Sequence, residues 1–61
     1  MTREEALLAM QNGSKIVHQY FMPHEYLYML NQAVLTEDGH VFSLFFDKSK
    51  EHYNEGWSIK E

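Results

Sequence analysis

The first thirteen residues, MTREEALLAMQNG, carry both the start and the stop signal of one short helix. Thr2 can act as the N-cap and Glu5 falls three residues later, which is the pattern of a capping box. Gly13 suits the left-handed position that ends a helix. The apolar residues between these signals have helical spacing: Ala6, Leu7, Met10 and, as a further candidate, Leu8. A helix of about three turns is not stable alone in water, so it must pack against the rest of the chain.

Residues 14–21, SKIVHQYF, have the β-branched and aromatic content of a strand. We expect one face of this strand to carry Ile16, His18 and Tyr20. The strand is predicted to end at Met22-Pro23, because proline has no N–H to donate to a β-ladder.

Two further segments, residues 25–30 (EYLYML) and 33–36 (AVLT), are predicted to form a hairpin around Asn31-Gln32. Asparagine tolerates the left-handed backbone angles that such a turn needs. Asp38-Gly39 is a strong turn signal and marks the next reversal of the chain.

Residues 40–53 are ambiguous. Val41, Phe42, Phe45 and Phe46 match a helix stripe, but a strand over residues 40–45 is also consistent, because short apolar runs do not discriminate between the two. We expect a strand or turn at 40–42, followed by a helical or irregular segment that can include a short second helix near 43–53.

The last segment, EGWSIKE, is predicted to be a strand with Trp57 and Ile59 on one face. The whole chain, residues 1–61, is then a single domain of the α+β class. Its N-terminal helix is expected to pack on a small antiparallel sheet of three or four strands.

Composition narrows the functional classes. The net charge is −4, from nine acidic and five basic residues, so the basic surface that binds nucleic-acid phosphates is missing and we expect no direct nucleic-acid binding. No segment approaches the roughly 20 apolar residues of a membrane span, and the N-terminus does not have the pattern of a signal peptide. The expected location is the cytoplasm of a host cell.

Size and the absence of cysteine favour association with another molecule. A chain of 61 residues buries only about 60% of its unfolded surface, so small domains are usually reinforced by disulfides, a metal or oligomerisation. There is no cysteine, which excludes disulfides and thiolate metal sites. We therefore expect a homo-oligomer.

No constellation of residues predicts catalysis or a cofactor. The four histidines, at positions 18, 24, 40 and 52, have no spacing that places two imidazoles on one element, so no metal site is predicted. The glycines at positions 13, 39 and 56 form no phosphate-binding loop, and each is explained by a turn or a cap. We expect a protein that is not an enzyme; the enzyme alternative would rest on His18, His24, Glu25 and Asp38.

Nine aromatic side chains exceed what the core of so small a domain can hold. Some must therefore face outward or toward a partner, although several can form an ordinary core. The segment YFMPHEY, residues 20–26, combines aromatic rings, a flexible methionine and a stiffening proline, and is the predicted contact surface, with a plain connecting turn as the alternative. The predicted binding residues are Tyr20, Met22, His24, Tyr26, Tyr28 and Trp57.

The stretch EALLAMQNGSKIVHQYF resembles the opening of many short phage and prophage proteins, in which a helix beginning EAL is followed by NGxK and a strand. Within that group, the chain resembles the Thoeris anti-defence family of small sequestering proteins. Members of that family pair this opening with a T-x-D-G turn and a terminal D-W-x-I or similar. Here the turn is TEDG at 36–39 and the end is GWSI at 56–59, so the likeness extends over most of the chain.

The resemblance implies a compact α+β fold, a homo-oligomer without catalytic activity, and binding of a cyclic nucleotide-derived immune signal at subunit interfaces. The leading hypothesis is thus a non-enzymatic phage-type inhibitor that binds a bacterial defence protein or sequesters its nucleotide messenger. For a nucleotide ligand, Arg3, Lys15 and His18 are the predicted phosphate contacts. The alternative is a structural or regulatory protein-interaction module unrelated to immunity.

Overall fold

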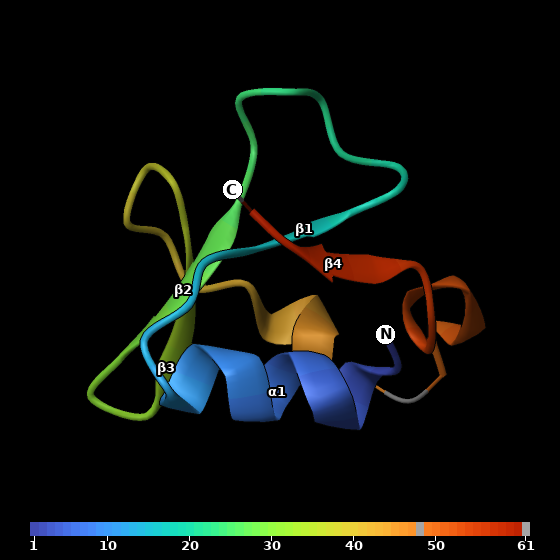
Figure 1. Ribbon diagram of the computed structural model, residues 1–61, viewed down its shortest axis with the longest axis horizontal. Helices are drawn as coiled ribbons and strands as arrows, with labels where there is room; N and C mark the ends of the chain where they lie inside the picture. Colours follow the sequence, from blue (N-terminus) through green and yellow to red (C-terminus); the bar gives the residue numbers. More distant parts are fainter. Residues whose placement is uncertain (48, 61) are drawn as a thin grey trace.

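The computed structural model, which describes residues 1–47 and 49–60, contains one helix and one four-stranded antiparallel sheet (Figure 1). The elements follow in the order α1 (Arg3–Gln11), β1 (Ile16–His18), β2 (Leu27–Leu30), β3 (Ala33–Thr36), the 3-10 helices η1 (Ser43–Phe46) and η2 (Glu51–Tyr53), and β4 (Trp57–Ile59). The strand order is β3-β2-β1-β4, and α1 packs along one face of the sheet. The predicted α+β class is confirmed.

The capping box of α1 is present as predicted. The Thr2 Oγ1 accepts a hydrogen bond of 3.2 Å from the Glu5 N–H, and the Glu5 carboxylate accepts one of 2.8 Å from the Thr2 N–H. Gly13 has φ +93°, the left-handed conformation expected after the helix. Of the predicted apolar stripe, Ala6 and Met10 are buried and Leu7 is partly buried against the core, whereas Leu8 is 60% exposed.

The hairpin of β2 and β3 turns at Asn31 and Gln32, as predicted, with φ values of 52° and 67°. Positive φ at both central residues is the requirement of a type I′ turn, whose twist matches that of the strands. The next turn closes when the Gly39 N–H donates to the Thr36 carbonyl oxygen at 2.9 Å.

One predicted boundary is wrong. The strand predicted over 14–21 stops at His18, because the chain turns there and the Phe21 N–H donates back to the His18 carbonyl oxygen. The segment after the TEDG turn agrees with the prediction: a single β-bridge joins Val41 to Leu35, and two separate 3-10 turns, η1 and η2, follow in place of one continuous helix.

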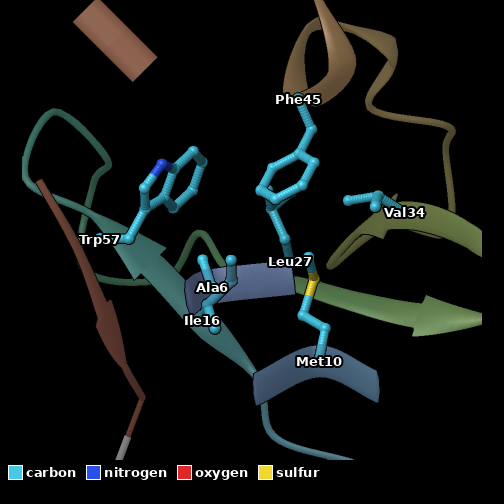
Figure 2. Close-up of a cluster of buried hydrophobic side chains, with 7 residues drawn as sticks. All are labelled: Ala6, Met10, Ile16, Leu27, Val34, Phe45 and Trp57. Carbon is cyan, nitrogen blue, oxygen red and sulfur yellow. The ribbon is translucent and has the colours of Figure 1, made fainter. Parts of the chain in front are cut away.

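The core lies between α1 and the sheet and is closed by η1 (Figure 2). Every element except η2 contributes a fully buried side chain: Ala6 and Met10 from α1, Ile16 from β1, Leu27 from β2, Val34 from β3, Phe45 from η1 and Trp57 from β4. Since Ile16 and His18 point toward this core, alternation places Val17 on the opposite face, which α1 does not cover.

Candidate binding surface beside the loop between β1 and β2

The loop of residues 19–26, which connects β1 to β2, projects from the sheet as two consecutive turns (Figure 1). The first turn closes from the Phe21 N–H to His18. The second closes from the Glu25 N–H to the Met22 carbonyl oxygen, and the Glu25 carboxylate in turn accepts from the Met22 N–H at 2.7 Å. These bonds and Pro23 hold the loop in one shape, so that Tyr20 and Met22 remain 67% and 62% exposed.

His18 anchors the base of this loop. Its ring is 3% exposed, Nε2 lies 2.7 Å from the Glu55 carbonyl oxygen, and Nδ1 lies 3.2 Å from the Tyr20 main-chain nitrogen. A carbonyl can only accept and a main-chain N–H can only donate, so Nε2 carries the proton of a neutral imidazole. His18 therefore joins β1, the loop and the residues that precede β4.

A shallow pocket of about 260 Å³ lies between the loop and the end of β4. It is lined by Val17, His18, Phe21, Met22, Pro23, Ile59 and Lys60. The pocket combines residues far apart in the sequence because β4 pairs antiparallel with β1, placing Ile59 opposite Ile16. Trp57 and Ile59 are two positions apart in β4 and so lie on one face of the strand, as predicted. Trp57 is buried, whereas Ile59 is 49% exposed.

Two lysines converge on Tyr26 at the edge of this pocket. The Lys15 and Lys60 Nζ atoms lie 4.9 and 5.9 Å from the centroid of the Tyr26 ring, within the range of cation–π contacts. The Lys60 main-chain N–H also donates to the Lys15 carbonyl oxygen at 2.8 Å, which pairs the main chains of the two residues. Tyr28 follows at 6.2 Å between ring centroids. Lys60 lines the pocket and therefore joins this cluster of two lysines and two tyrosines to it.

Three of the predicted site residues are buried and serve the fold. The Trp57 ring is 2% exposed and its Nε1 donates to the Tyr53 carbonyl oxygen at 2.7 Å, so the ring offers no free face for stacking. His18 is occupied as described above. The predictions of a stacking role for Trp57 and a phosphate contact for His18 are therefore not supported by their placement.

Arg3 is the third buried residue, at 7% exposed. Its Nη2 donates long hydrogen bonds of 3.4 and 3.3 Å to the carbonyl oxygens of Asp47 and Lys50, and its Nε has no partner among the described residues. Arg3 thus links α1 to Asp47 and Lys50 and is not placed to meet a surface phosphate.

The remaining predicted residues lie on the loop or next to it. Tyr20, Met22, Tyr26 and the exposed His24 lie on the loop, Lys15 contacts the Tyr26 ring, and Tyr28 lies in β2 beside Tyr26. Lys60, Phe21 and Ile59 were missed by the sequence analysis. The pairing of β4 with β1 brings Lys60 to Lys15. The sequence of the last strand alone does not say which strand it pairs with, so this contact was not predicted.

Other chemistry is sparse in the part of the chain that the structure describes. No group of three or more histidine, aspartate or glutamate side chains there is arranged to hold a metal ion, and α1 is too short to cross a membrane. Of the nine aromatic rings, only Phe45 and Trp57 are fully buried.

These features define a small α+β protein with an exposed, hydrogen-bonded aromatic loop beside a pocket that Lys60 lines. Comparison of the chain with protein-family models, with curated proteins and with solved structures finds no match. The functional argument therefore depends on the residues and their geometry.

Proposed function

We propose that this chain is a non-enzymatic, phage-type inhibitor of a bacterial defence system, which acts by binding a defence protein or by sequestering its nucleotide signal. The observation that carries the proposal is the β1–β2 loop, in which a stiff backbone presents Tyr20 and Met22 to solvent beside the pocket that Lys60 lines. Exposed aromatic and methionine side chains on a preorganised loop are typical of binding anchors, since little conformational entropy is lost on binding.

A homo-oligomer is part of this proposal. Seven of the nine aromatic rings keep some exposure in the single chain, and the pocket is open and smaller than the roughly 300–1,000 Å³ of most ligand sites. A second copy would cover these rings and deepen the pocket, as an interface between subunits does.

The sequestration route is favoured by the cationic groups beside the pocket, because a nucleotide signal offers both a ring and phosphate. The protein-binding route is favoured by the exposed loop, because Tyr20 and Met22 are suited to a flat protein surface. A thermal-shift panel of cyclic nucleotides and ADP-ribose derivatives separates the routes. Stabilisation by a member of the panel supports sequestration, and no shift from any of them removes that route and leaves protein binding.

The function itself is tested by phage infection. Bacteria that carry a Thoeris system and express this chain should support plaque formation by a phage that the system otherwise blocks. Met22→Gln should reduce this rescue, whereas Leu8→Gln should not, since Leu8 is exposed to the same extent, 60% against 62%, but lies on α1. Absence of rescue by the wild-type chain, or equal loss in both variants, would contradict the proposal.

A further inference from the structure

We propose that the face of the sheet opposite α1 docks one acidic amphipathic helix of a partner protein. The apolar stripe of that helix would lie on Tyr28 and Leu35, and its carboxylates would meet Lys15 and Lys60. This inference rests on the proposed function, because it names the chemistry of the partner in the protein-binding route, and Tyr26 belongs both to the contact loop and to this face.

Alternation along β2 and β3 defines the side chains of this face, which we call the open face because α1 lies on the other side of the sheet (Figure 1). Leu27 and Val34 are buried in the core, so their neighbours Tyr28 and Leu35 point away from α1. Tyr28 lies directly opposite Leu35, and Leu35 in turn pairs with Val41, which is 68% exposed. These last three side chains form an apolar and aromatic row across the sheet.

The two outer strands are already paired along part of their free edges. Beside β3, the Phe42 N–H donates to the Val34 carbonyl oxygen at 2.8 Å. Beside β4, the Trp57 N–H donates to the Met1 carbonyl oxygen at 3.3 Å. Addition of a partner strand at either edge would have to displace these contacts. A partner therefore fits better on the open face, which a helix or a second sheet can cover.

The size of the open face matches one helix. Strands of three or four residues are about 10–13 Å long, and four adjacent strands span about 14 Å between the outer two. A helix is about 10–12 Å in diameter, and three turns of it are about 16 Å long. The nine-residue helix α1 already packs on the opposite face in this way. A single helix is thus the occupant that the area favours over a second sheet.

The charge of the open face is opposite to that of the whole chain. The net charge is −4, but the Lys15 and Lys60 Nζ atoms lie 4.9 and 5.9 Å from the centroid of the Tyr26 ring, which is itself 6.2 Å from the Tyr28 ring. The adjacent acidic residue, Glu25, accepts a hydrogen bond within the loop. Two ammonium groups beside an apolar row complement a helix whose apolar stripe is flanked by carboxylates, and they repel a basic one.

The test is a titration of the whole chain with two synthetic peptides of about four helical turns, followed by amide NMR. Both peptides carry leucines along one stripe. Glutamates flank the stripe in the acidic peptide, and lysines flank it in the basic peptide. The acidic peptide should bind at least about tenfold more tightly, because the basic one meets like charges. It should shift the amide signals of Tyr28 and Leu35, whereas the signal of Leu8, which is exposed on α1, should stay in place.

Charge reversal provides the second arm. The double variant Lys15→Glu, Lys60→Glu should reverse the preference, so that the basic peptide binds more tightly than the acidic one. Lys50→Glu, which reverses an exposed lysine away from the open face, is the matched control and should keep the wild-type preference. The amide spectrum of each variant also shows whether it is folded.

Four results would overturn the inference. These are no binding of the acidic peptide, equal affinity for the two peptides, an unchanged preference in the double variant, and shifts that exclude Tyr28 and Leu35. Two rival occupants are tested in the same samples. Sedimentation with phosphatidylglycerol vesicles without binding of the acidic peptide would assign the open face to a membrane surface. Shifts of Tyr28 and Leu35 that depend on protein concentration alone would assign it to a second copy of the chain, and either result would contradict the helix.

Failure of this inference is distinguishable from failure of the proposed function. If the acidic peptide does not bind but Met22→Gln still reduces phage rescue and Leu8→Gln does not, the partner chemistry is wrong and the inhibitor function stands. If the acidic peptide binds on the open face but the wild-type chain gives no rescue, the docking face is real and the defence role is wrong.

Discussion

His18 donates a hydrogen bond of 2.7 Å from Nε2 to the main-chain carbonyl oxygen of Glu55, and this contact fixes where the candidate binding surface begins. The bond crosses from β1 to the residues before β4, which are 37 positions away in the sequence. The same ring accepts from the Tyr20 N–H, so the β1–β2 loop leaves the sheet in a defined direction.

Replacing His18 with alanine should destabilise the fold by about 2–4 kcal/mol, because it opens a cavity beside Trp57 and leaves the Tyr20 N–H and the Glu55 carbonyl without their partner. Urea denaturation measures the change in the free energy of unfolding. His40→Ala is the matched control and should change that free energy by less than about 0.5 kcal/mol, since His40 is exposed. Similar values for the two variants would contradict the assigned anchoring role.

Gly56→Ala should be more destabilising than Gly39→Ala. Both glycines have positive φ, +92° and +85°, so both variants incur the left-handed backbone cost of about 1 kcal/mol. A Cβ at position 56 would also lie 3.0 Å from atoms of Gln19 and His18, whereas a Cβ at position 39 meets nothing within 4 Å. The difference between the two thermal midpoints isolates that steric clash, and equal midpoints would show that the contact at Gly56 is not tight.

The capping box of α1 makes stability depend on pH. Hydrogen bonds from Thr2, first from its main-chain N–H and then from its hydroxyl, lower the pKa of Glu5. Because the folded pKa lies below the unfolded one, this contribution is fully present above the unfolded pKa and is lost as pH falls through the folded pKa. Thermal midpoints measured between about pH 6 and pH 3 should fall less steeply for Glu5→Gln, whose amide can still cap but does not titrate. Parallel curves would refute the contribution of Glu5.

Gln32→Gly should stabilise the β2–β3 hairpin. Gln32 has φ 67° in a two-residue turn where asparagine followed by glycine is preferred, and glycine adopts that angle without steric cost. We expect a gain of about 0.5–1 kcal/mol in the free energy of unfolding, after allowing for the greater freedom of glycine in the unfolded chain. The measurement is again urea denaturation. A loss of stability would mean that the Gln32 side chain contributes contacts that outweigh the turn strain.

Local signals in the sequence predicted the parts of the fold that depend on neighbouring residues. The capping box of Thr2 and Glu5, the turn at Asn31-Gln32 and the turn that ends at Gly39 all form as expected, because each is closed by bonds within a few positions. These elements are sufficient for the α+β class.

The end of β1 and the lining of the pocket depend on contacts between residues far apart in the sequence, and local sequence signals did not predict them. β1 ends at His18, where the chain turns and the His18 ring contacts the distant Glu55 carbonyl oxygen. The pairing of β4 with β1 brings Trp57 opposite His18. The loop was identified as a contact surface from its composition. The pocket beside it depends on Lys60 and Ile59, which only the pairing of β4 with β1 brings to that place.

The most direct test of the binding surface is methyl NMR of the four methionines, recorded while the nucleotide panel and then the purified proteins of a Thoeris system are added. Met22 is 62% exposed on the loop and Met10 is 2% exposed in the core, so the chain contains its own control. We predict that the Met22 methyl signal shifts or broadens with one of these partners while the Met10 signal stays in place. Binding that leaves the Met22 signal unchanged, or no change with any partner, would contradict the account.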